Sequence, residues 1–197
     1  MSKVLQMAWA IWSLIPWQGA GRTRLEVPES LRVPAGEEVV LETHAKGVQI
    51  YACQVGADQK PGWVLKAPEA ELTDATGKTI VRHSAGPTWR HSDGSEVTAK
   101  VAAKQDAPKP GAIPWLLLTV TGHKGEGILS HVTSIQRIHT EGGLAPAANP
   151  CEAATNGKEA RSLYEADYWD LPSWPPLFAQ RPPSLCPSLA RRGSNSS

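Results

Sequence analysis

Apolar and polar side chains alternate along much of the chain, and this period of two is typical of half-buried β-strands. The clearest case is residues 96–105, where one face of the predicted strand is apolar and the other carries Glu, Thr and Lys. Residues 115–121 are apolar almost throughout and therefore predict a core strand that is buried on both faces. No stretch of about eleven residues shows the 3.6 period and the caps of a helix.

Further strands are expected wherever β-branched and aromatic residues lie between turn residues. A hairpin through residues 45–47 is expected to join the first two, and Pro68 is expected to bend the third. These strands are predicted at residues 38–44, 48–54, 63–72, 78–83, 88–90, 128–140 and 162–169. Together they predict an all-β single domain of about eight to ten mostly antiparallel strands, as a sandwich or a closed barrel, over residues 25–169.

The two ends of the chain differ from this domain. Residues 1–20 place Lys3 before an apolar stretch and small residues at Gly19 and Ala20, which is the layout of a secretory signal, with cleavage expected near Ala20. The alternative is an amphipathic leader that stays attached. Residues 170–197 contain six prolines and show no periodicity, which predicts a disordered tail. We expect a secreted, periplasmic or cell-envelope protein without an integral membrane span after processing.

Charge and cysteine content narrow the function classes. With 20 basic and 19 acidic side chains the formal net charge is +1, so no field is expected to attract nucleic acid. The three cysteines, Cys53, Cys151 and Cys186, include no CxxC pair, which argues against a zinc ribbon or a thioredoxin-like motif. An oxidising compartment allows one disulfide among them, and spacing alone does not select the pair.

Catalytic and metal signatures are weak. The histidines show no HxH or HExxH spacing, so neither a metal site nor a metal cofactor is expected. No GxSxG elbow accompanies the serines that adjoin histidines. A hydrolase that uses His83 with a carboxylate such as Asp93 remains the alternative to a non-enzymatic protein.

Tryptophans give the stronger hint of a binding site. Trp63, Trp89 and Trp115 flank predicted turns, where exposed indoles form a platform for a glycan or other flat small molecule and buried ones form a core. The turn that ends in Trp89 also lies beside a histidine. We therefore expect a ligand site, if present, at His83, Trp89, Asp93 and His123.

Six ordered blocks resemble a known family. They are GVQIYAC from Gly47, WVLKAPEAEL from Trp63, HSAGPTW from His83, DGS from Asp93, AIPWLLL from Ala112 and VTSIQRIHTEGGLAP from Val132. Together they resemble the bacterial and fungal family called domain of unknown function 3455, over about residues 27–168. The family usually ends soon after a strand similar to Tyr164–Trp169, where this chain continues into its proline-rich tail.

The resemblance implies a small, usually exported domain without an established activity or cofactor. A malate dehydrogenase label carried by some fungal members does not transfer, because this chain has no GxGxxG in a βαβ pattern. Counterparts of Cys53 and Cys151 look usual in the family, whereas Cys186 lies in the divergent tail. The resemblance therefore predicts a Cys53–Cys151 disulfide, and the competing hypothesis is three free thiols in a cytosolic protein.

Overall fold

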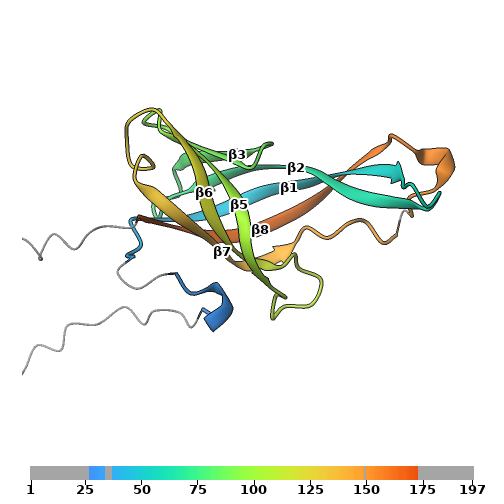
Figure 1. The fold of residues 1–197 in the computed structure, drawn as a ribbon, viewed down its shortest axis with the longest axis horizontal. Coiled ribbons are helices and arrows are strands. Elements are labelled where there is room, and N and C mark those ends of the chain that lie inside the picture. Colours follow the sequence, from blue (N-terminus) through green and yellow to red (C-terminus); the bar gives the residue numbers. More distant parts are fainter. Residues whose placement is uncertain (1–26, 34–36, 149, 173–197) are drawn as a thin grey trace, which may run out of the picture.

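The computed structural model of the protein describes residues 27–33, 37–148 and 150–172. Within these residues eight antiparallel strands form a closed barrel in which each strand pairs with its neighbours in the chain and β8 returns to β1 (Figure 1). They are β1 (Leu41–Val55), β2 (Pro61–Thr73), β3 (Thr79–Ser84), β4 (Thr88–His91), β5 (Glu96–Gln105), β6 (Trp115–Lys124), β7 (Val132–Gly142) and β8 (Glu159–Pro172). The all-β prediction is confirmed, and of the two expected architectures the chain adopts the barrel.

The expected hairpin at residues 45–47 is wrong, because β1 runs unbroken through this stretch. Gly47 lies opposite Ala70 of β2, and a Cβ on Gly47 would come within 2.2 Å of the carbonyl oxygen of Glu69. Glycine in a strand interior often marks such a close approach of two backbones rather than a turn. The predicted irregularity of β2 is present, as a bulge that leaves Lys66 between the paired Leu65 and Ala67.

The prediction that β6 is buried on both faces is also wrong for most of the strand. Only Trp115 and Leu118 are buried among the residues of this strand, and Thr119 is exposed. The boundary expected for β7 at residue 128 is wrong as well, because residues 125–131 form a turn. Two bulges then interrupt the alternation of β7, so that it does not keep one set of side chains on one face.

The lead-in before the barrel lies against its outer wall. The 3₁₀ helix η1 (Glu29–Leu31) buries Leu31 completely, in a small cluster with Trp115 and Ile138. Gln136 donates a hydrogen bond of 2.6 Å from Nε2 to the carbonyl oxygen of Leu31. This cover explains why the outward side of β6 is apolar in sequence, although its face is only partly buried.

The predicted Cys53–Cys151 disulfide is formed. The two Cα atoms lie 5.3 Å apart and 98 residues apart in sequence. The bond joins the end of β1 to the connection between β7 and β8, which includes the 3₁₀ helix η2 (Ala153–Thr155). It fixes the part of the barrel where the β1–β2 hairpin and the start of β8 project together (Figure 1).

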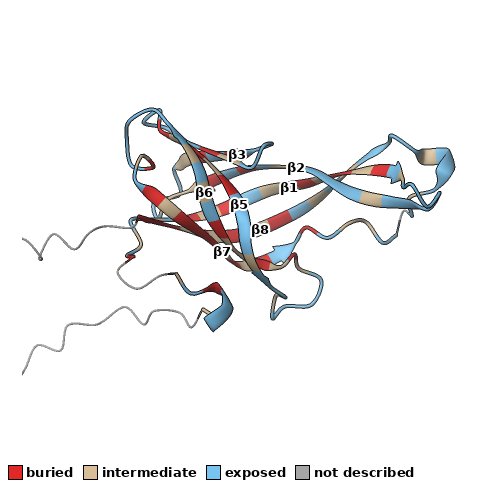
Figure 2. Cartoon of the chain, viewed as in Figure 1, coloured by how far each residue is buried: buried red, intermediate tan, exposed pale blue. Residues whose placement is uncertain are grey.

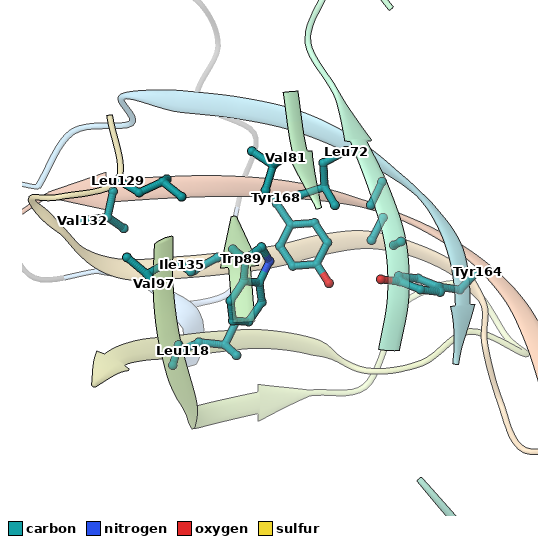
Figure 3. Close-up of a cluster of buried hydrophobic side chains, with 14 of the residues drawn as sticks. Leu72, Val81, Trp89, Val97, Leu118, Leu129, Val132, Ile135, Tyr164 and Tyr168 are labelled. Atoms are coloured by element: carbon teal, nitrogen blue, oxygen red, sulfur yellow. The ribbon is translucent and has the colours of Figure 1, made fainter. Parts of the chain in front are cut away.

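One end of the barrel is closed by side chains and a pinned loop. Leu129 and Val132 are completely buried and lie at one side of the core, with Trp89 and Tyr168 further along it and Tyr164 beyond them (Figure 3). Asp93, in the β4–β5 turn, accepts hydrogen bonds from the backbone amide of Ser95 at 2.8 Å and from that of Ile128 at 2.8 Å. We call this end of the barrel, which comprises Leu129, Val132, the β4–β5 turn and residues 125–131, the closed end.

Glycine makes the closed end possible. Gly127 has φ +151°, and a Cβ there would come within 2.3 Å of the Asp93 carboxylate. A Cβ on Gly125, at φ +72°, would come within 2.5 Å of the Gly94 carbonyl oxygen. The glycine-rich link after β6 therefore lets the loop approach the β4–β5 turn closely.

Strand β8 continues to Pro172, three residues beyond the domain boundary expected at residue 169, and Asp170 and Leu171 are buried. The expected signal segment, residues 1–20, and the rest of the expected tail, residues 173–197, lie outside the described residues. Within the described part of the chain, no helix has the length and apolar character needed to cross a bilayer.

Candidate functional site

A cavity of about 120 Å³ lies inside the barrel, in the half away from the closed end. Paired residues on antiparallel strands point to the same face, and Gln49, Pro68, His83 and Trp89 belong to one inward-facing set by their registers. All eight strands and the β3–β4 turn contribute to the lining, which consists of Gln49, Leu65, Pro68, His83, Pro87, Trp89, Val101, Leu116, Leu118, Arg137 and Tyr168.

The lengths of the strands explain why the cavity opens to the surface. β3 and β4 are short, so residues 61–69 of β2 and residues 99–105 of β5 extend past the last pairs that they make with them. The gap between β2 and β5 lies over the β3–β4 turn and is bordered by Leu65, Pro68, Pro87 and Val101. We call this opening the window. Leu65 and Val101 are 52% and 54% exposed although both line the cavity.

His83 and Trp89 form the floor of the cavity. They are paired across β3 and β4, and their rings stack with centroids 4.0 Å apart and an interplanar angle of 12°. Tyr168 meets both rings edge-on, at 5.7 Å from His83 and 6.0 Å from Trp89. Such edge-to-face and stacked contacts fix the three rings relative to one another.

His83 is neutral at physiological pH. Burial lowers its pKa to about 4, an effect that the backbone carbonyl of Thr88 partly opposes and the charge of Arg137 reinforces. A carbonyl oxygen only accepts, so Nδ1 carries the proton and donates to Thr88 over 3.0 Å. Nε2 of the neutral ring is therefore a hydrogen-bond acceptor.

Several polar groups of the interior lack partners among the described residues. Nε2 of Gln49, Nε1 of Trp89, Nε of Arg137 and the hydroxyls of Tyr164 and Tyr168 are buried without a hydrogen bond. The two hydroxyls point toward one another (Figure 3). Burial and the neighbouring Tyr168 raise the pKa of Tyr164 far above its ordinary value, so this phenol stays protonated. Gln49, Trp89, Arg137 and Tyr168 line the cavity. Because buried polar groups are nearly always paired, these four unpaired groups indicate a site for a ligand or ordered water.

The four residues expected from sequence at a ligand site divide between the two halves of the barrel. His83 and Trp89 lie together in the cavity, whereas Asp93 and His123 do not line it. Asp93 lies in the turn at the other end of β4 from Pro87, and although partial burial opposes it, hydrogen bonds from Ser95, Ile128 and His91 hold its pKa well below its ordinary value. His123 donates from Nε2 to the carbonyl oxygen of Val132 at 2.7 Å.

Two of the tryptophans belong to the core rather than to an exposed platform. Trp89 is 2% and Trp115 is 8% exposed. Trp63 is half-buried and pairs with Cys53 on β1. The platform of three exposed indoles is therefore wrong, and the core alternative is confirmed for Trp89 and Trp115.

Sequence reasoning missed the residues that complete the cavity. Gln49, Arg137 and Tyr168 come from three different strands, and only the registers of the closed barrel bring them to the same half of the interior. The bulge between Ile138 and Glu141 also separates Arg137, which lines the cavity, from His139. The one available signal was the strand alternation that puts Gln49 on the same face as Tyr51 and Cys53.

A second cluster of polar groups lies on the outer wall. Nδ1 of His44 is 2.8 Å and Nδ1 of His139 is 2.8 Å from the two carboxylate oxygens of Asp167, and Nε2 of His44 is 3.1 Å from Glu165. His139 has a positive φ of 49°, which turns it out of the regular strand at the bulge. Each of these groups has a partner within the cluster, and no set of His, Cys, Asp and Glu among the described residues is arranged to hold a metal ion.

Comparison with known proteins identifies a family but no activity. Neither a curated protein nor a solved structure matches the chain. A family model matches residues 34–171, which include β1 to β7 and all of β8 except its last residue. The chain therefore belongs to the family described as Protein of unknown function (DUF3455).

Proposed function

We propose that this protein is an exported, non-enzymatic barrel that binds a small molecule in the cavity beside the window. The observation that carries the proposal is the coincidence of an apolar cavity, an opening to the surface and several buried polar groups without partners. Ligand sites are typically apolar hollows with a few convergent polar groups that set orientation.

The cavity favours binding over hydrolysis. No carboxylate, serine or cysteine is among its lining residues. The carboxylate that a hydrolase was expected to use, Asp93, is engaged by Ser95 and Ile128 at the closed end. His83 is the remaining candidate for acid–base chemistry, and its pKa of about 4 makes it a weak base near neutral pH.

Size and lining favour a small molecule over a glycan. A dry apolar cavity of about 150 Å³ holds benzene, so the present volume of about 120 Å³ suits a single ring or a short branched chain. A sugar needs many more hydrogen-bond partners than this lining offers. Larger ligands extend through the window.

Export is supported by the disulfide. Disulfides persist in oxidising compartments, and the Cys53–Cys151 bond is compatible with an extracellular or periplasmic location. Sequencing the amino terminus of protein from its native host tests this: a start near residue 21 is expected, and intact Met1 on cytoplasmic material contradicts export.

The binding proposal is tested by a screen of small aromatic and short-chain compounds, detected by ligand-observed NMR. Val101→Trp puts a large ring at the exposed edge of the window and is expected to abolish the binding of every genuine hit. Leu163→Trp is the matched control, because Leu163 is 80% exposed on β8 and does not line the cavity. A screen without hits, or hits that bind the Val101→Trp variant unchanged, contradicts the proposal.

A further inference from the structure

The cavity carries an unpaired positive charge. Arg137 lines it from β7 and donates from Nη2 to the carbonyl oxygen of Pro114 at 2.8 Å, while its buried Nε has no acceptor. Among the described residues Arg137 has no ion pair with an acidic side chain. Arginine is always protonated in proteins, so this charge is not removed by titration.

The charge of Arg137 reaches the interior. After burial, it is a further cause that lowers the pKa of His83, and it partly offsets the rise that burial produces in the pKa of Tyr51 and of Tyr164. These three side chains come from β3, β1 and β8, so the guanidinium acts on the inside of the barrel rather than on the outer wall alone.

The other unpartnered nitrogen groups of the cavity are also donors. Nε1 of Trp89 can only donate, and the amide nitrogen of Gln49 donates two hydrogens. Both residues are only 2% exposed, so water at the surface does not satisfy them. Three residues with unpartnered donors, one of them the cationic Arg137, therefore line the cavity, and no acidic side chain is among its described lining residues.

We propose that the ligand is a small organic anion, a carboxylate carried by a ring or a short alkyl chain, with its charged group against Arg137 and its apolar part against Leu116 and Leu118. This inference rests on the proposed binding function and names the chemical class of its ligand. A carboxylate accepts several hydrogen bonds at once and pairs with guanidinium geometry, which matches the donors present. The ring or chain fills the apolar volume behind the window.

The alternative occupant is a neutral apolar compound that leaves the donors unpaired. A site whose buried polar groups stay unpaired discriminates strongly against such a ligand. We therefore expect benzoate to bind at least tenfold more tightly than benzyl alcohol, which has the same ring and no charge.

The test compares benzoate, benzyl alcohol and benzene by isothermal titration and NMR on the full chain and on two variants. Arg137→Met keeps a long side chain and removes the charge and the donors. This variant is expected to bind benzoate at least tenfold more weakly, and its affinity for benzyl alcohol should change by less than twofold. Arg82→Met is the matched control, because Arg82 is a surface residue paired with Glu71 on the outer wall; benzoate affinity should stay within twofold.

The outcomes separate the two proposals. Binding of benzene or benzyl alcohol but not of benzoate overturns the anion inference and leaves a neutral-ligand cavity. An equal loss of benzoate affinity in Arg137→Met and Arg82→Met also overturns the anion inference, because the effect then comes from the net charge of the protein. If none of the three probes binds the unaltered protein, the proposed binding function itself fails. Circular dichroism and the unfolding midpoint of Arg137→Met show whether this variant is folded. If its folding is impaired, Arg137→Lys replaces it in the test. The lysine keeps the charge, so this variant should retain part of the benzoate affinity.

Discussion

The two ends of the barrel use polar groups in opposite ways. At the closed end, Asp93 accepts hydrogen bonds from two backbone amides and from the hydroxyl of Ser95 at 2.6 Å, and Leu129 fills the interior behind it. In the half with the cavity, Gln49, Trp89 and Arg137 keep donors without acceptors. Buried residues are frequent along the closed part of the barrel, and the projecting β1–β2 hairpin is largely exposed or half-buried (Figure 2).

This difference indicates that one end of the barrel stabilises the fold and the other half is suited to binding. The hydrogen bonds that Asp93 accepts and the burial of Leu129 and Val132 stabilise the closed end. Unpartnered donors reduce stability, and a fold retains them where something outside the chain supplies the acceptors. Two residues depart from this pattern: Asp170 and Glu37 are buried near the closed end, and Oδ1 of Asp170 and Oε2 of Glu37 have no partner.

The largest effect on stability is expected from removing the Cys53–Cys151 disulfide, which holds the projecting β1–β2 hairpin. Replacing Cys53 and Cys151 together by Ser should lower the free energy of unfolding by up to about 4–5 kcal/mol, since the bond closes a loop of 98 residues. Urea unfolding of unreduced protein measures this. An unchanged urea midpoint would show that the barrel is equally stable without the disulfide, which contradicts this prediction.

Two leucines of β2 compare the halves directly. Leu72→Ala should cost about 2–5 kcal/mol, because Leu72 is completely buried and its loss leaves a cavity. Leu65→Ala should cost less than about 1 kcal/mol, since Leu65 is 52% exposed at the window. Denaturant unfolding of the pair is the measurement, and similar costs for both contradict the contrast.

Asp170 gives a pH-dependent prediction. Burial raises its pKa to about 7 from 3.8, so its folded form holds a proton that the unfolded chain has lost. Stability from this group is present below about pH 4 and is lost as the pH rises to 7. Asp170→Asn should therefore stabilise the protein at pH 8 by about 2–3 kcal/mol, less than the roughly 4 kcal/mol of the full shift because the amide also lacks a partner. A gain that is equal at pH 4 contradicts this account.

The smallest effect is expected on the outer wall, away from both ends. A hydrogen bond from His44 to Asp167 raises the pKa of His44; partial burial opposes this, and Glu165 adds to it. The stabilisation is present below about pH 6.5 and disappears as the pH rises through the folded-state pKa. Because His44 is 43% exposed, His44→Ala should cost only about 0.5 kcal/mol at pH 5.5 and less at pH 8.5. Thermal unfolding at the two pH values decides it, and the opposite trend refutes the assignment.

Much of the fold could be predicted from local pattern. The alternation of residues 96–105 and the β-branched and aromatic runs at residues 63–72, 78–83 and 88–90 predicted strands that the structure contains. The sequence does not reveal close backbone approaches or bulges, because they depend on the neighbouring strand. Gly47 was therefore interpreted as a turn, although it lies inside β1 where β2 passes close by.

The candidate site could be predicted only in part. His83 and Trp89 are neighbours across a short turn, so local sequence brings them together. Gln49, Arg137 and Tyr168 join them through the closure of β1 with β8 and the register of β7, which no local pattern encodes. The disulfide was predicted through the family resemblance and not through the spacing of the cysteines.

Amide and side-chain NMR of isotopically labelled protein during a benzoate titration tests the division between the two ends most directly. We expect the indole N–H of Trp89, the side-chain amide of Gln49 and the backbone amides of Leu65 and Val101 to shift with one common affinity. The amides of Ser95 and Ile128, held by Asp93 at the closed end, should stay in place. Shifts that are largest at the closed end, or no shifts in the cavity with any small organic acid, would contradict it.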